Sequence, residues 1–217
     1  MMNKKVIAVA LALVLAGGGY AQNDASGKRV KAYMVSDAHL DTQWNWDLTH
    51  TIREYIPRIL FQNLWMLERY PDYKFNFEGG IIYRWMKEYY PLHYARLQKY
   101  IDEGRWHISG ASWNANDPNM PSAESFIRNI LQGQELYKRE FGVRSTDIFL
   151  PDCFGFGYTL PSLAAHCGLI GFSTQKLSWR KHDFFPDAPY HKKNPFSWGV
   201  WYGIDGQSLM AAFDTGG

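Results

Sequence analysis

Residues 36–47 (SDAHLDTQWNWD) bring a histidine, several carboxylates and two tryptophans into one short segment. The segment follows an apolar run at residues 30–35 (VKAYMV), which is typical of a buried strand. Side chains at positions i and i+2 of an extended segment point to the same side. His39 and Asp41 can therefore converge on one cation through an imidazole nitrogen and a carboxylate oxygen. A histidine and an aspartate at this spacing also occur often by chance, so an ordinary polar loop is the alternative interpretation.

Two further polar segments follow hydrophobic stretches of the chain. Residues 150–157 (LPDCFGFG) place Asp152 directly after an apolar run, and the glycines allow the backbone to turn sharply. Residues 110–119 (GASWNANDPN) place Trp113 and Asp117 after another expected strand. Considered singly, Asp152 is explained as a turn or cap residue, and Asp117 is explained by Asx-turn chemistry.

The three segments indicate more together than they do singly, because each offers a carboxylate beside an aromatic side chain. Aromatic rings pack against the apolar faces of pyranose sugars, while carboxylates and a metal ion bind the hydroxyl groups. The sequence therefore predicts a catalytic rim suited to sugar chemistry.

The elements that must position this rim alternate between strand and helix patterns. This order predicts an α/β fold with a parallel sheet and helices outside it, either open or closed into a barrel. In both cases functional groups collect in the loops at the carboxyl ends of the strands, where the three segments lie. Strands are expected at 30–36, 73–78, 105–109, 146–150, 170–175, 196–202 and 208–213, and helices within 49–69, 80–90, 91–103, 122–141 and 159–167.

Several helix ends can be predicted from single residues. Pro57 predicts a kink or a late start in the first helix, since proline has no backbone N–H to donate. Ser122 is expected to cap the helix that follows it, with Glu124 in the first turn, and Gly142 is expected to end that helix. Gly104 is likewise expected to end the stretch at 91–103.

The first 21 residues have the pattern of a secretory signal peptide, with a basic start, an apolar stretch and small residues before Ala21. The protein is therefore expected to be exported to the periplasm or the extracellular space. No later apolar stretch is long enough for a membrane anchor. Removing Lys4 and Lys5 with this segment takes the formal charge from +2 to zero, which argues against nucleic acid as a partner.

The remaining composition is that of a globular protein, with 46% hydrophobic and 20% charged residues, which excludes a disordered chain. Cys153 lies in a loop and Cys167 closes a predicted helix, a separation too large for a disulfide, so both are expected to be reduced thiols. A thiol at Cys153 could also meet a soft metal ion. Nothing in the sequence specifies an oligomeric state.

The order and spacing of the motifs resemble a known family. The matching segments are residues 39–44 (HLDTQW), Trp113 and Asp117 with 121–125 (PSAES), 150–155 (LPDCFG), 194–196 (NPF) and 201–206 (WYGIDG). The chain resembles the N-terminal catalytic domain of glycoside hydrolase family 38, the zinc-dependent retaining α-mannosidases, over essentially all of residues 30–217. The expected domains are a signal peptide at 1–21 and the N-terminal part of a parallel β/α barrel-like catalytic domain at 28–217.

The resemblance implies a mechanism and roles for particular residues. Zn²⁺ would be held by His39, Asp41 and Asp152, and Asp152 would also be the nucleophile that attacks the anomeric carbon. The substrate would be a terminal α-mannosidic bond in a mannose-containing oligosaccharide or glycoprotein glycan, whose cis 2- and 3-hydroxyls bind zinc. Trp44 and Phe154 match aromatic residues that line the sugar pocket. Asp117 and Lys176 complete the expected substrate contacts.

Lys176 matches a cationic residue near the nucleophile, where its charge would help keep Asp152 ionised. A surface lysine without this role is the alternative. The family's remaining zinc histidine and its acid/base carboxylate would lie beyond residue 217. The chain is therefore expected to be truncated, with an incomplete barrel, and inactive alone.

Two alternatives to an α-mannosidase remain open from the sequence. A metal-dependent polysaccharide deacetylase would also use histidine and aspartate near strand ends. Such enzymes usually carry two histidines four residues apart on one helix, and no two of the seven histidines have that spacing. The second alternative is a secreted sugar-binding remnant without catalytic activity.

Overall fold

The structure is a computed structural model that describes residues 34–175 and 198–213. The expected signal peptide, Lys176 and the segment 194–196 lie outside the described residues. The strands are β1 (Ser36–Ala38), β2 (Phe75–Phe77), β3 (Trp106–Ile108), β4 (Asp147–Phe149), β5 (Gly171–Ser173), β6 (Trp198–Tyr202) and β7 (Ser208–Ala212). The helices are α2 (Leu48–His50), the π-helical turn η1 (Thr51–Tyr55), α3 (Ile56–Arg69), α4 (Gly80–Tyr89), α5 (Pro91–Tyr94), α6 (Leu97–Asp102), α7 (Ala123–Phe141) and α8 (Leu160–His166).

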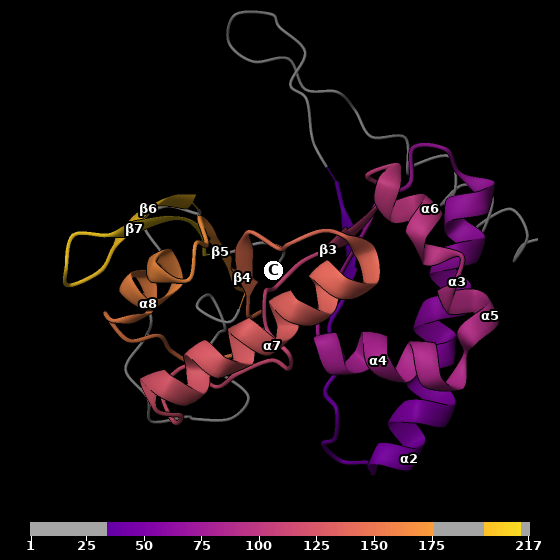
Figure 1. The fold of residues 1–217 in the computed structure, drawn as a ribbon, viewed down its shortest axis with the longest axis horizontal. Helices are drawn as coiled ribbons and strands as arrows, with labels where there is room; N and C mark the ends of the chain where they lie inside the picture. Colours follow the sequence, from indigo (N-terminus) through magenta and orange to yellow (C-terminus); the bar gives the residue numbers. More distant parts are fainter. Residues whose placement is uncertain (1–33, 176–197, 214–217) are drawn as a thin grey trace, which may run out of the picture. The chain divides into compact units, whose positions relative to one another are not determined.

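The described strands form two sheets, with the orders β1-β2-β3 and β4-β5-β7-β6 (Figure 1). All neighbouring pairs are parallel except β6 and β7. The expected α/β fold with parallel sheets is confirmed. Among the described strands, β6 and β7 form the antiparallel pair, because the short turn at 203–207 can connect only antiparallel neighbours. Beyond β3 the chain runs beside β4, since the Ala111 N–H donates to the Asp147 carbonyl at 2.9 Å.

The first strand begins later than the apolar pattern predicts. Met34 and Val35 are exposed, and β1 is formed instead by Ser36–Ala38, which follow them. The position of β1 is set by its register with β2, in which Ser36 pairs with Phe75 and Ala38 pairs with Phe77. Strand pairing has therefore overridden the local hydrophobic pattern at this point.

The helix boundaries follow the residues that predicted them. Pro57 is the second residue of α3, and the π-helical turn η1 precedes it, which confirms the expected late start of a regular helix. The Ser122 hydroxyl accepts a hydrogen bond from the Ser125 N–H at 3.2 Å, and Gly142 ends α7 with a φ of 72°. The helix expected at 91–103 is divided into α5 and α6.

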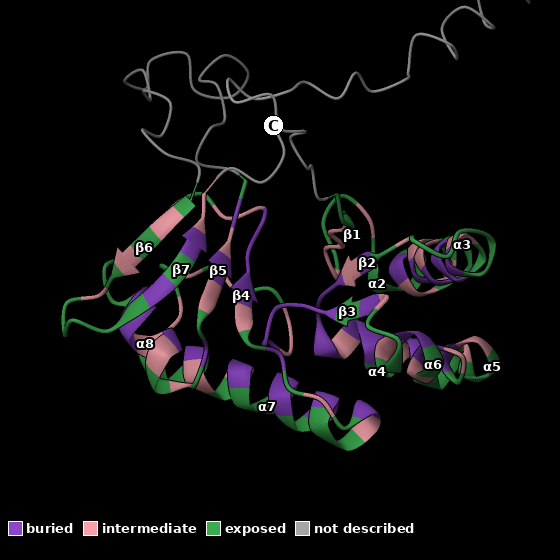
Figure 2. Cartoon of the chain, turned by 90° about the horizontal axis from the view of Figure 1, so that it is seen from above, coloured by how far each residue is buried: buried purple, intermediate pink, exposed green. Residues whose placement is uncertain are grey.

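Two clusters of buried side chains form the core. One cluster lies around β1–β3 with α3, α4 and the end of α7, and the other lies around β4, β5 and β7 with α8 and the start of α7. Helix α7 contributes Phe126 and Ile130 to the second cluster, and Tyr137 and Phe141 to the first. Its buried stripe faces the strands in Figure 2. One long amphipathic helix thus packs against both groups of strands.

The same helix holds the loop that follows β3. One face of α7 carries Asn129, Gly133 and Tyr137, which follow one another at intervals of four residues. The Asn129 side chain donates to the Asn114 carbonyl at 2.7 Å, and the Tyr137 hydroxyl donates to the Ser112 carbonyl at 3.2 Å. Between them, Gly133 allows the backbone of the loop to contact the helix directly.

The amino end of α4 holds this loop from a second direction. The Gly80 N–H donates to the Ser112 carbonyl at 3.2 Å, and the Ile81 N–H donates to the Trp113 carbonyl at 2.8 Å. These are N–H groups of a first helical turn, which have no acceptor within their own helix. The loop between β3 and α7 is therefore fixed by two helices at its start.

The turn between β6 and β7 packs on α8. The Asp205 carboxylate accepts hydrogen bonds from the Ser162 hydroxyl at 2.6 Å and from the Gln207 N–H at 3.1 Å, and it lies 3.0 Å from His166 Nε2. A methyl group on Gly203 would lie only 2.8 Å from the Ser162 nitrogen, so the turn contacts the helix directly. Asp205, which lies in the segment 201–206 (WYGIDG), therefore stabilises the packing of this turn on α8.

The Asp205 contacts predict how stability depends on pH. The hydrogen bond from Ser162 lowers the pKa of the Asp205 carboxyl, and Gln207 and His166 add to this against the opposing effect of desolvation. A carboxyl with a lowered pKa stabilises the fold above its ordinary pKa of about 3.9, and that contribution is lost as the pH falls through the lowered value. The melting-temperature difference between the wild type and Asp205→Asn should be larger near neutral pH than at strongly acidic pH. Asp72→Asn, at an exposed turn, is the control, and a pH-independent difference at Asp205 would contradict the prediction.

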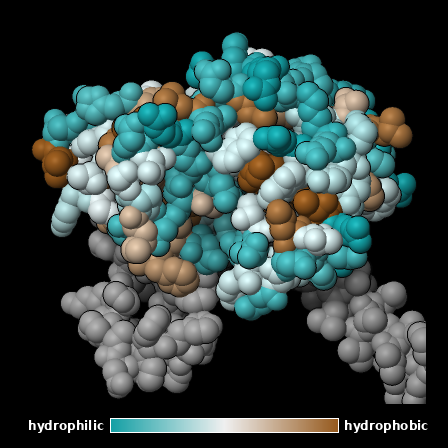
Figure 3. Space-filling view, turned by 60° about the horizontal axis from the view of Figure 1, so that its bottom comes forward, coloured by the Kyte–Doolittle hydropathy of each residue, from teal (hydrophilic) through white to brown (hydrophobic). Residues whose placement is uncertain are grey.

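The surface in Figure 3 carries hydrophobic residues in small separate groups among hydrophilic ones. Within residues 34–175 and 198–213, no helix combines the length and apolar character that crossing a bilayer requires.

Candidate metal centre

His39, Asp41 and Asp152 come together at the carboxyl ends of β1 and β4. Each offers one ligand atom, and these atoms all lie within 4.8 Å of one another. All three residues are partly buried. The two strands belong to different sheets, so the cluster joins loops that are far apart in the sequence. The arrangement follows from the general rule that loops at the carboxyl ends of parallel strands meet on one side of the fold.

Within the first loop, His39 and Asp41 lie on the same side as their spacing predicts. His39 Nε2 is 3.3 Å from Asp41 Oδ1. The loop then leads into α2, which begins where the Asp47 side chain accepts a hydrogen bond from the His50 N–H at 2.8 Å. The polar residues after β1 thus comprise two candidate ligands followed by a helix cap.

The other nitrogen of His39 has a partner that sequence reasoning missed. His39 Nδ1 lies 2.9 Å from Glu78 Oε1, and the Glu78 side chain is only 8% exposed. Glu78 follows β2 directly and belongs to none of the three segments that the sequence singles out. The available signal was a carboxylate that follows β2 at the position next to His39, and it becomes visible only once β1 and β2 are aligned.

The His39 and Glu78 side chains influence each other's protonation. Burial raises the pKa of Glu78 above its ordinary value, although its hydrogen bond with His39 opposes this. Burial also works against a charged His39, but the hydrogen bond to Glu78 and the charges of Glu78 and Asp41 raise the pKa of His39 overall. Binding a metal ion through His39 Nε2 requires that nitrogen to be free of a proton.

Cys153 is adjacent to Asp152 but is a poor candidate ligand. Burial, together with the charges of Asp117, Glu78 and Asp41, raises the pKa of the Cys153 thiol to about 12. The thiol donates to the Asn116 carbonyl at 3.1 Å. Because only the thiolate binds metal ions strongly, the raised pKa disfavours a metal bond here. Cys153 and Cys167 are both free thiols, as expected.

The aromatic side chains expected near the sugar are exposed. Trp44 is 70% exposed and Phe154 is 74% exposed. Trp44 contacts Trp46 edge to face, with ring centroids 5.9 Å apart. Both loops therefore present aromatic surface to solvent beside the cluster.

Asp117 lies on the third predicted segment, in an exposed turn. Its carboxylate accepts a hydrogen bond from the Asn119 N–H at 2.8 Å, which is Asx-turn chemistry. The Asn119 side chain in turn donates to the Gly155 carbonyl at 2.9 Å, so this loop is tied to the loop that carries Asp152 and Phe154. Lys176, the fourth expected substrate contact, lies outside the described residues.

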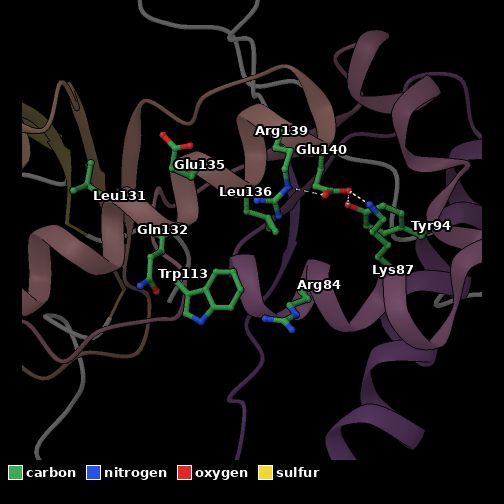
Figure 4. A pocket seen from close by; sticks show the side chains of 10 residues that line it. All are labelled: Arg84, Lys87, Tyr94, Trp113, Leu131, Gln132, Glu135, Leu136, Arg139 and Glu140. Atoms are coloured by element: carbon green, nitrogen blue, oxygen red, sulfur yellow. Dashed lines mark hydrogen bonds and ion pairs between the residues drawn. The ribbon is translucent and has the colours of Figure 1, made fainter.

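A separate open groove of about 620 Å³ lies between α4 and α7 (Figure 4). Arg84 and Lys87 from α4 and Arg139 and Glu140 from α7 line it, and Glu140 lies 3.2 Å from the Arg139 guanidinium. His39, Asp41 and Asp152 are not among its lining residues. The groove is therefore not the site of the candidate metal ligands.

The donor set of the cluster fits a zinc ion. One imidazole nitrogen and two carboxylate oxygens are ligands that zinc accepts, and three protein ligands leave a position open for water or substrate. Imidazole with carboxylates also suits other divalent transition metals, so the ligands alone do not specify the metal. The side chains of His39, Asp41 and Asp152 are therefore compatible with the expected zinc ion.

Comparison with known proteins gives the family. Residues 29–215 match the family described as glycosyl hydrolases family 38 N-terminal domain. The chain belongs to glycosyl hydrolase family 38. The description of the matching family names glycosyl hydrolases and not the polysaccharide deacetylases that the sequence left open.

Several proteins that are similar in sequence to this chain are α-mannosidases. The chain is 35% identical to α-mannosidase G of Dictyostelium discoideum over 188 residues, which cover 87% of this chain and 16% of that protein. It is 32% identical to an α-mannosidase of Saccharomyces cerevisiae over 185 residues, covering 85% and 16%. The chain therefore spans about a sixth of the length of these relatives.

A solved structure supports the fold independently. The structure of an α-mannosidase from Enterococcus faecalis superposes with a TM-score of 0.66 at 22% identity. The match covers 82% of this chain and 19% of that chain. This likeness supports the fold of the chain.

Proposed function

We propose that this chain forms the zinc-binding and nucleophile-bearing part of the active site of an α-mannosidase. The reaction would be hydrolysis of terminal α-mannosidic bonds in oligosaccharides or glycoprotein glycans, with retention of configuration. The observation that carries the proposal is the convergence of His39, Asp41 and Asp152 in a family 38 domain. The α-mannosidase relatives support the substrate class.

Asp152 has two tasks in this proposal. Its carboxylate attacks the anomeric carbon from the face opposite the leaving oxygen, which is protonated and departs as an alcohol, and a glycosyl ester forms. Water then displaces the carboxylate from the face that the leaving group vacated, so that two inversions retain the configuration. His39 and Asp41 hold the metal ion with it. Zinc bound there would supply Lewis-acid stabilisation and a grip on the cis hydroxyls of the sugar.

The exposed side chains beside the cluster would bind the sugar. Trp44 and Phe154 offer flat apolar surfaces that can pack against the faces of a pyranose ring. Asp117 is close enough to the cluster for its charge to raise the pKa of Cys153. Its carboxylate can also accept a hydrogen bond from a sugar hydroxyl. Lys176 is proposed as the cationic partner of the nucleophile on the basis of the family motif.

A retaining glycosidase needs a second carboxyl group about 5–5.5 Å from the nucleophile, to protonate the leaving oxygen. In this proposal that group and a further zinc histidine are not among the motifs of this chain. The 217-residue chain alone should therefore bind zinc weakly and show no useful turnover of an α-mannoside. Export to the periplasm or extracellular space is likewise proposed, from the pattern of residues 1–21.

Zinc titration of the chain tests the proposed site. Asp41→Ala removes a charged oxygen ligand, and we expect the zinc affinity to fall by roughly 10-fold or more, as the loss of one of three ligands implies. The dissociation constant can be measured by competition with a chromogenic chelator.

Asp47→Asn is the matched control, because it removes a carboxylate from the same loop while retaining a residue able to cap α2. Its zinc affinity should equal that of the wild type. Equal affinity of Asp41→Ala and the wild type would refute the metal site.

A further inference from the structure

The positions of His39 and Glu78 follow from the register of two neighbouring strands. Ala38 in β1 pairs with Phe77 in β2, and the strands are parallel. His39 and Glu78 each come one residue later, so they are neighbours at the carboxyl ends of these strands. Gly79 then turns the chain with a φ of 92°, a conformation that favours glycine, and α4 begins directly afterwards.

Glu78 is enclosed on the side away from His39. A methyl group on Gly110 would lie 3.2 Å from Glu78 Oε2 and 3.3 Å from its β-carbon, so the backbone of the next loop covers the carboxylate. The Glu78 side chain is 8% exposed. A carboxylate buried to this extent costs free energy unless a donor satisfies it. The neighbouring polar group is His39 Nδ1, which lies 2.9 Å from Glu78 Oε1.

His39 has carboxylates on both sides of its ring, and their geometry differs. The Nδ1–Glu78 distance of 2.9 Å is at the usual length of an N–H···O hydrogen bond. The Nε2–Asp41 distance of 3.3 Å is beyond the usual range, and the Asp41 side chain is 38% exposed and can turn to water. A neutral imidazole carries one N–H, and the buried carboxylate is the better acceptor for it.

We infer that Glu78 is a positioning residue that holds the His39 imidazole with Nδ1 protonated and with the Nε2 lone pair directed at Asp41 and Asp152. The inference rests on the proposed function, in which His39 binds the metal ion through Nε2. Glu78 contributes by fixing the tautomer and the ring orientation of a ligand, which makes that ligand more basic and less costly to order. It does not itself contact the metal ion or the sugar.

Zinc affinity of the 217-residue chain tests this role. Removing a hydrogen-bond partner of a metal-bound histidine typically costs 10–100-fold in metal affinity, so Glu78→Ala should bind zinc weaker by about that factor. Glu78→Gln keeps an oxygen that can accept from Nδ1–H, and its loss should be smaller. Asp147→Asn is the matched control, because Asp147 is a second partly buried carboxylate that acts on Glu78 but has no contact with His39. Its zinc affinity should stay within about 3-fold of the wild type.

The tautomer of His39 provides a readout that needs no metal. Long-range ¹H–¹⁵N correlations of the metal-free chain at alkaline pH, where the ring is neutral, should show the proton on Nδ1 in the wild type and in Glu78→Gln. In Glu78→Ala the proton should be distributed over both nitrogens. Thermal melting establishes that each variant is folded. If Glu78→Ala does not fold, Glu78→Gln still tests the role of Glu78.

Three outcomes separate the inference from the proposed function. Zinc affinity of folded Glu78→Ala equal to that of the wild type would overturn the positioning role. A proton on Nε2 of His39 in the metal-free wild type would also overturn it. A proton on Nδ1 in a wild-type chain that binds no zinc would support the role of Glu78 and refute the proposed metal site.

Discussion

Asp152→Asn is expected to abolish turnover in a catalytically active α-mannosidase that contains this chain. An amide can still bind zinc weakly, but it cannot form the glycosyl ester on which the proposed mechanism depends. Loss of a covalent nucleophile reduces kcat on the order of 10⁴-fold or more. Steady-state hydrolysis of a chromogenic α-mannoside measures this loss.

Asp41→Asn is the comparison that separates the two tasks of Asp152. Both substitutions replace a carboxylate ligand by an amide, but in the proposal only Asp152 attacks the sugar. Asp152→Asn should therefore reduce kcat much more than Asp41→Asn does at saturating zinc. A mechanism-based mannosyl label recovered on another residue, or equal losses in both variants, would refute the assignment of the nucleophile.

Gly133→Ala should be among the most destabilising substitutions in the chain. In an open helical position alanine would be favoured over glycine by about 1 kcal/mol. Here the added methyl group would lie 2.7 Å from the Trp113 nitrogen and would overlap the Ala111 carbonyl oxygen. The loop is held in place by Asn129 and Tyr137, so it cannot withdraw without losing hydrogen bonds. We expect a loss of about 3 kcal/mol or more in the free energy of unfolding.

For a chain of this length that loss lowers the melting temperature by roughly 10 °C, which calorimetry or circular dichroism can measure. Gly157→Ala is the matched control, because its methyl group would meet no atom closer than 3.8 Å. Its melting temperature should change little. If Gly133→Ala had the same melting temperature as the wild type, the close contact between α7 and the loop would not exist in solution.

The positions of most elements could be predicted because the signals are local. The hydrophobic patterns located most of the described strands and helices within a few residues, and Ser122 and Gly142 marked the ends of α7 through chemistry within one turn. Pro57 marked the start of α3 for the same reason. The rule that side chains gather at the carboxyl ends of parallel strands placed the candidate ligands on one rim.

The features that could not be predicted depend on pairing between distant segments. The late start of β1 is decided by its partner strand β2. Gly133 has no local signal, since a glycine within a helix is explained only by the loop that packs against it. Glu78 resembles any residue at the end of a strand until the register places it beside His39.

The central claim is that His39, Asp41 and Asp152 hold one zinc ion. Anomalous diffraction at the zinc absorption edge, from crystals of the zinc-loaded chain, tests this most directly. We predict one peak about 2.0–2.2 Å from His39 Nε2 and from an oxygen of each of the two carboxylates. A zinc peak at Cys153 or beside His107, with none between these three side chains, would contradict the account.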